Sequence, residues 1–227
     1  LITADADAVP GNIQCTVTMT AGTDEYPYQE QETINLDLTL SQFGFPLDGI
    51  VVKSSPIVAD LNSDGVKEIY FGSDYEALHG YNSFGEEIDG FPFQSTDRVR
   101  SSPAVGDVDN DGQMEIVFGN SSGKLYVVNH DGAQQLAYNI LGFIEGSPAL
   151  ADMDGDQDLE IFFTTTTTSG GQLYAIHHNG ITMPGFPKEL GSMWTGPAVH
   201  DIDNDGAYDI ICTTYDKEVY AIEVNGG

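Results

Sequence analysis

The sequence predicts an all-β fold made of four repeated units, each with four short strands. Four segments align without gaps, at residues 54–73, 101–120, 146–165 and 195–214. The first aspartates of their acidic loops are 47, 45 and 49 residues apart. Within each unit, short apolar runs alternate with turns rich in Gly, Asn and Asp. Periods of about 40–50 residues with several strands each are typical of propeller blades. We therefore expect a β-propeller-type array, either closed with four blades or an arc of a larger propeller.

The strands of one unit are expected in a constant order. The first follows a Ser-Pro or Gly-Pro pair, as at 56–59, and the second follows the acidic loop, as at 68–71. The third carries an aromatic residue, as at 125–128, and ends at a turn. A fourth strand is expected at Gly-Phe-Pro in residues 44–46, 90–92 and 185–187, and at Leu141-Gly142-Phe143 in the second repeat. The last repeat stops after its third strand, so residues 44–46 are a candidate for closing the ring.

The N-terminal region differs from the repeats. We expect residues 1–41 to form a separate unit before the propeller repeats of residues 42–227. Polar and apolar residues alternate at 13–19 and 34–40, which predicts two half-buried strands, and the polar segment 21–32 is expected to connect them. The pair resembles the last strands of an immunoglobulin-like sandwich domain. Because the chain begins at Leu1, we expect it to be a piece of a longer protein.

Each repeat has an acidic loop between its first two strands. Counted from the first aspartate, carboxylate or amide side chains recur at positions 1, 3, 5 and 9, and position 7 offers a backbone carbonyl. Position 6 is glycine in three loops and Gln157 in the third. Such sets of oxygen atoms favour Ca²⁺, which takes ~6–8 oxygen ligands. The sequence shows no set of thiolates or imidazoles that would favour zinc. We expect up to four Ca²⁺ ions, with ligands at Asp60, Asn62, Asp64, Val66, Glu68, Asp107, Asp109, Asp111, Gln113, Glu115, Asp152, Asp154, Asp156, Asp158, Glu160, Asp201, Asp203, Asp205, Ala207 and Asp209.

These loops are not EF-hands. An EF-hand needs a bidentate glutamate at position 12 and flanking helices, whereas position 12 here is apolar and the flanks are strand-like. The acid at position 9 resembles instead the FG-GAP or VCBS-type repeat of the integrin alpha-subunit propeller. Phe71-Gly72 and Phe118-Gly119 resemble the phenylalanyl-glycyl element of that family, and the Ser-Pro or Gly-Pro pairs are a looser match to its second element. The resemblance covers roughly residues 42–227.

Composition restricts the possible functions. The 36 acidic and 7 basic residues give a net charge of −29, which disfavours nucleic acids and anionic membranes as partners. No apolar stretch approaches the ~18 residues of a membrane span, so we expect no membrane insertion. The five histidines follow the repeats rather than forming a shared site, and no nucleophile motif occurs, so we expect no enzymatic activity. The cysteines, Cys15 and Cys212, are either buried free thiols or one disulfide.

The resemblance implies a role. Such repeats occur in secreted or surface-anchored bacterial proteins, as calcium-stabilised modules for adhesion, protein–protein interaction or surface assembly. The expected partner is a protein or glycan on a cell surface, or a second copy of the chain. The alternative is an accessory module of a secreted enzyme, such as a subtilisin-like or gingipain-like protease or a polysaccharide lyase.

Overall fold

The computed structural model describes residues 11–23, 26–38, 42 and 44–224. Contacts divide the chain into two compact units, Leu1–Pro46 and Leu47–Gly227. Every regular element of the described residues is a β-strand, which confirms the predicted all-β class. None of these residues belongs to a helix long and apolar enough to cross a membrane.

The first unit contains an antiparallel hairpin. Strand β1 (Gly11–Thr23) pairs with β2 (Tyr26–Leu38) along their whole lengths, with Cys15 opposite Ile34. The two expected strands are therefore present, but the predicted connector over residues 21–32 is wrong, because most of it is strand. Thr and Tyr are strong strand formers whether or not they are buried, and polarity alone did not reveal this. Residues 39 and 40 of the second predicted strand lie outside the described residues.

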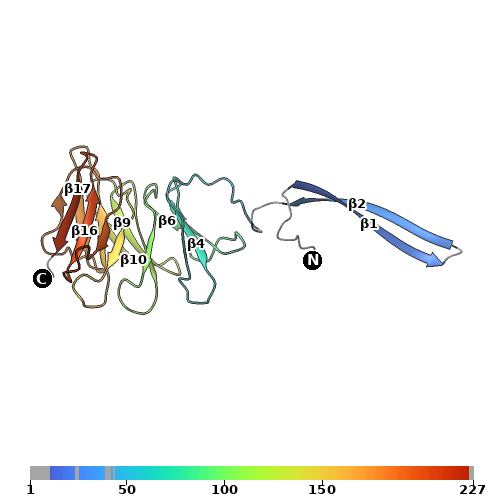
Figure 1. Cartoon of the computed structure of the whole chain (residues 1–227), viewed down its shortest axis with the longest axis horizontal. Helices are drawn as coiled ribbons and strands as arrows, with labels where there is room; N and C mark the ends of the chain where they lie inside the picture. The colour runs from blue at the N-terminus through green and yellow to red at the C-terminus, as the bar shows by residue number, and fades with distance from the viewer. Residues whose placement is uncertain (1–10, 24–25, 39–41, 43, 225–227) are drawn as a thin grey trace. The chain divides into compact units, whose positions relative to one another are not determined.

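The second unit contains four antiparallel sheets in succession (Figure 1). The first is β3 (Ile57–Ala59), β4 (Glu68–Gly72), β5 (Ala77–Tyr81) and β6 (Phe93–Gln94). The second is β7 (Ala104–Gly106), β8 (Glu115–Gly119), β9 (Lys124–Asn129) and β10 (Gln134–Asn139). The third is β11 (Ala149–Ala151), β12 (Glu160–Thr164), β13 (Gln172–Ile176) and β14 (Lys188–Glu189). The fourth is β15 (Ala198–His200), β16 (Tyr208–Thr213) and β17 (Val219–Val224). The predicted propeller-type blades are confirmed.

The edge of the last blade is open among the described strands. Its strand order is β15-β16-β17, so β17 pairs with β16 alone. Residues 44–46, the candidate closing strand, form a turn and not a strand. The described blades are consistent with an arc, and they show no closure of the ring.

The fourth strands differ from the expectation in detail. Strands β6 and β14 begin directly after Gly-Phe-Pro and contain two residues each, so the motif is a turn that precedes the strand. Its glycines, Gly90 and Gly185, have left-handed φ angles of 86° and 84°, and proline has no N–H to donate to a sheet. In the second blade, which lacks this proline, β10 is six residues long and precedes Leu141-Gly142-Phe143.

The hydrophobic core lies between neighbouring blades. Because successive side chains of a strand point to opposite faces, one strand serves two cores. In β12, Ile161 and Phe163 pack with residues of the second blade, whereas Phe162 packs with residues of the fourth. Cys212 of β16 belongs to the last of these cores as a free buried thiol, and burial raises its pKa to about 11. This state of Cys212 agrees with the first of the two alternatives, a buried free thiol.

The Phe-Gly element marks a close approach between blades. A Cβ atom on Gly119 would lie 2.1 Å from Cγ2 of Ile144, in the segment that leads to the third blade. Gly72 has the same relation to Val99 at 2.4 Å. The third blade has Thr164 at this place, and its hydroxyl donates to the carbonyl of Thr195 at 2.7 Å. Glycine is therefore needed at this position in the blades where an apolar side chain from the following segment packs directly against the strand backbone.

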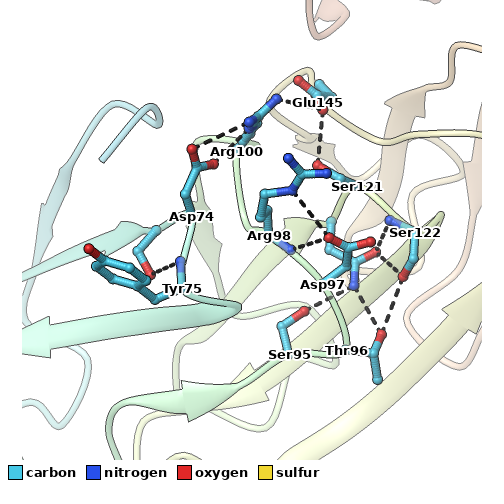
Figure 2. Close-up of polar contacts among 12 residues, drawn as sticks. Asp74, Tyr75, Ser95, Thr96, Asp97, Arg98, Arg100, Ser121, Ser122 and Glu145 are labelled. Atoms are coloured by element: carbon cyan, nitrogen blue, oxygen red, sulfur yellow. Dashed lines mark hydrogen bonds and ion pairs between the residues drawn. The ribbon is translucent and has the colours of Figure 1, made fainter. Parts of the chain in front are cut away.

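Polar contacts also link the first three blades (Figure 2). The Arg100 guanidinium lies 2.7 Å from Asp74 Oδ1 and 3.8 Å from Glu145 Oε1. Ser121 Oγ donates to the same Glu145 oxygen at 3.0 Å, and Lys53 lies 3.4 Å from Asp74. Arg100 lowers the pKa of Asp74, chiefly through their hydrogen bond. These contacts join residues of three successive repeats.

Candidate metal loops

Each acidic loop joins the first two strands of its blade. The first aspartate directly follows the first strand, as Asp107 follows β7, and the acid at position 9 lies at the start of the second strand, as Glu115 begins β8. The strand pair β7–β8 holds both ends of the loop, because Gly106 is directly opposite Glu115. The four loops therefore occupy the same place in the four blades.

Backbone amides orient the aspartates inside each loop. In the second loop, Asp107 accepts hydrogen bonds from the amides of Asp111 and Gly112 at 3.0 and 2.9 Å. Asp111 in turn accepts one from the amide of Gln113 at 2.8 Å. The first and fourth loops repeat these bonds at Asp60 and Asp201. Short side chains that bond the backbone two to five residues ahead make the loop compact.

A left-handed residue at position 6 completes the turn. The glycines there, Gly65, Gly112 and Gly206, have φ angles of 87°, 89° and 94°. Gln157 has φ 83° at the same place, so the third loop keeps the conformation at a cost of about 1 kcal/mol. This loop also changes one hydrogen bond, since Asp152 Oδ1 accepts from Gly155 instead of the residue at position 5.

The acids at position 9 are buried. Glu115 is only 1% exposed, and its Oε2 accepts the amide of Val108 at 2.9 Å. Glu160 and Asp209 make the same bond to the amides of Met153 and Ile202. Burial, followed by the charges of the aspartates in its loop, raises the pKa of Glu115 to about 7, although the hydrogen bond from Val108 acts in the opposite direction. A cation among these oxygens would offset the cost of burying the charge.

The structure brings many predicted ligands together. In the second and fourth loops, one carboxylate oxygen from each of positions 1, 3 and 9 lies within 4.8 Å of the others. In the third loop, two overlapping groups have this spacing. The grouped residues are Asp107, Asp109 and Glu115; Asp201, Asp203 and Asp209; Asp152, Asp154 and Asp156; and Asp156, Asp158 and Glu160. Position 5 of the second and fourth loops, Asp111 and Asp205, lies outside these groups and bonds the amide at position 7.

The first loop forms no such group because Asn62 replaces an acid. Asn62 instead donates to Asp64 at 3.1 Å, and Asp64 accepts the amide of Val66 at 2.7 Å. Glu68 is 4% exposed, its Oε2 has no hydrogen-bond partner, and it lines a pocket of about 500 Å³ beside the loop. Burial raises the pKa of Glu68. An orphaned buried oxygen at this position is the feature expected of a ligand atom.

Two residues near the third loop were not predicted as part of a site. His177 Nδ1 lies 3.0 Å from Glu160 Oε1, and His178 Nδ1 lies 2.8 Å from Asp158 Oδ2. Both follow β13, and sequence reasoning assigned them to a repeat position. Only the pairing register of β12 and β13 shows that His177 is opposite Glu160.

Comparison with known families agrees with the repeat pattern. Two overlapping segments, residues 107–163 and 152–212, match the model of the FG-GAP-like repeat. Residues 107–212 therefore resemble FG-GAP-like repeats. The matched region begins at Asp107, position 1 of the second loop, and ends at Cys212, position 12 of the fourth. The resemblance inferred from the acid at position 9 is thereby confirmed.

Solved structures share the fold. BBS1N, in its complex with ARL6DN, is 14% identical over 79% of this chain and 53% of that chain, with a TM-score of 0.57. BamB from Moraxella catarrhalis is 18% identical over 69% of this chain and 42% of that chain, with a TM-score of 0.51. The chain thus spans about half the length of these propeller-like structures. No curated protein matches its sequence.

Proposed function

We propose that this chain is a calcium-stabilised, non-catalytic propeller module that binds a protein partner outside the cell. One observation carries the calcium assignment: a buried acid at position 9 lies within 4.8 Å of two loop aspartates in both the second and the fourth blades. Acids at this burial are rare without a partner, and the repetition of the arrangement argues against a solvated turn.

The donor set fits calcium. The oxygen atoms come from carboxylates, with an amide in the first loop, and Ca²⁺ accepts such ligands in flexible geometry. Positions 1, 3, 5 and 9, with the carbonyl at position 7, would hold the ion in each loop. The cation would supply positive charge among carboxylates that otherwise repel one another in a chain of net charge −29.

The protein-binding role is supported by fold and charge. BBS1N, a structure with a similar fold, is seen in complex with ARL6DN. The strongly acidic composition favours a partner with a basic surface. The proposed secreted or cell-surface location agrees with the calcium assignment, because calcium sites of extracellular modules commonly have a Kd of about 10⁻⁴–10⁻³ M and are filled at extracellular calcium concentrations.

Calorimetric titration of the metal-free chain with Ca²⁺ at pH 8, where Glu115 is ionised, tests the assignment. We expect up to four ions and a rise in thermal midpoint, since each site at a hundredfold excess over Kd adds about 2.7 kcal/mol of stability. The Glu115→Gln variant keeps the side-chain shape and should bind one ion fewer. The Asp48→Asn variant removes an exposed carboxylate outside the loops and should bind as many as the wild type. A chain whose thermal midpoint does not respond to calcium or chelator would contradict the proposal.

A further inference from the structure

The third blade differs from the others in the residue opposite its ninth-position acid. The register of β12 and β13 pairs Ile161 with Ile176, which places His177 opposite Glu160. In the second blade Asn129 is opposite Glu115, and in the fourth Glu223 is opposite Asp209. Continuing the β4–β5 register places an asparagine, residue 82, at this point of the first blade. The imidazole is therefore particular to the third blade.

His177 joins the loop carboxylates at ligand distance. Its Nδ1 lies 3.0 Å from Glu160 Oε1, while the other Glu160 oxygen accepts the amide of Met153 at 2.7 Å. One ligand atom each of His177, Asp154 and Glu160 lies within 4.8 Å of the other two. Among the described residues, this is the one such group that contains a histidine. The His177 side chain is 22% exposed, so an ion can reach it from solvent.

A mixed set of nitrogen and oxygen selects a different kind of ion. Ca²⁺ is bound by oxygen, whereas imidazole nitrogen suits first-row transition ions such as Co²⁺, Ni²⁺ and Zn²⁺. One imidazole and two carboxylates provide three ligands and leave further positions for water. We propose that the third loop binds a first-row transition-metal dication through His177, Asp154 and Glu160, in competition with calcium. This site has two carboxylates in common with the calcium site of the proposed function. The observation that supports it is the position of the histidine beside them.

Asparagine substitutions supply a matched pair of variants. His177→Asn introduces the residue that the second blade has at the equivalent position, Asn129, so the blade architecture accepts it. His178→Asn removes the neighbouring imidazole, which lies 2.8 Å from Asp158 but outside the group of three. Circular dichroism of both variants establishes that they fold before metal binding is compared.

The experiment titrates the calcium-free full chain with Co²⁺, followed by visible absorption and calorimetry. The wild type should bind one equivalent of Co²⁺ more tightly than the rest, with an absorption band characteristic of nitrogen ligation. In His177→Asn the affinity of that site should fall at least about 10–100-fold, the loss usual even for an outer-shell partner of a metal ligand. His178→Asn should match the wild type. With calcium present, Co²⁺ should displace one equivalent of calcium and no more.

Two outcomes would overturn the inference. One is Co²⁺ binding by His177→Asn with the affinity and spectrum of the wild type. The other is an equal loss of Co²⁺ affinity in both variants, because such a loss would come from a change in the whole loop and not from a missing metal ligand. If no loop bound calcium, the proposed function would be wrong. The Co²⁺ titration of the wild type and the two variants would still decide whether His177 is a metal ligand.

Discussion

Strands β13 and β17 have nearly the same sequence and different surroundings. Both carry an aliphatic residue followed by Tyr-Ala-Ile, and both pair in the same register with the second strand of their blade. Yet Leu173 of β13 is fully buried, whereas Val219, its equivalent in β17, is 73% exposed. The comparison shows that a blade strand is buried by the next blade and not by its own sheet.

The alternation of side chains explains this difference. In β13, Tyr174 and Ile176 face the second blade, and Leu173 and Ala175 face the fourth. In β17, Ile222 still packs in the core shared with the third blade. The opposite face of β17 has no following blade among the described residues. It carries the exposed side chain of Glu223.

The largest expected effect comes from truncating the two equivalent residues. Leu173→Ala should lower the free energy of unfolding by about 2–5 kcal/mol, because it leaves a cavity between two blades. Val219→Ala should change it by less than about 0.5 kcal/mol, because the side chain is largely in water. Urea unfolding in saturating calcium measures both. Equal costs at the two positions would show that the face of β17 is covered in solution.

A second, smaller effect concerns the Phe-Gly element. Gly119→Ala places a methyl group against Ile144 and should cost about 1–3 kcal/mol through overpacking. Thr213 stands at the equivalent position of the fourth blade, where it is exposed. Thr213→Ala should therefore cost less than about 0.5 kcal/mol. The thermal midpoints of the two variants give the comparison, and a neutral Gly119→Ala would refute the close approach described for this glycine.

The smallest effect concerns the residue two positions before each Ser-Pro or Gly-Pro pair. Lys53, Arg100 and Glu145 hold this position in the first three repeats and share ion pairs, whereas Trp194 holds it in the fourth and is 52% exposed. Arg100→Ala should cost about 1 kcal/mol, the upper range for partly exposed ion pairs.

The neighbouring Arg98 provides a control. It is more exposed than Arg100 and contacts only Asp97 within the ion-pair distances described, at 3.4 Å. Arg98→Ala should leave the stability unchanged within about 0.5 kcal/mol. If raising the salt concentration did not reduce the cost of Arg100→Ala, that cost would arise from lost packing and not from charge.

Much of the candidate site could be predicted from sequence. Four copies of an in-register pattern placed the loops between the first two strands, and the apolar residue at position 12 with strand-like flanks excluded EF-hands. The sequence could not show that the acids at position 5 of the second and fourth loops, Asp111 and Asp205, lie outside the grouped carboxylates, because this depends on the three-dimensional path of the loop. Nor could it show His177 beside Glu160, since residues 17 apart meet only once the β12–β13 register is set.

The sequence by itself determined the repeat, the order of strands within a blade and the oxygen-rich loops. These depend on interactions within about twenty residues, where spacing, turn residues and side-chain alternation are local properties of the chain. The tertiary structure alone decided which faces are buried, why glycine follows phenylalanine in two blades and which loop includes an imidazole. These depend on the contact between one blade or strand and the next, and the same short sequence has different neighbours in β13 and in β17.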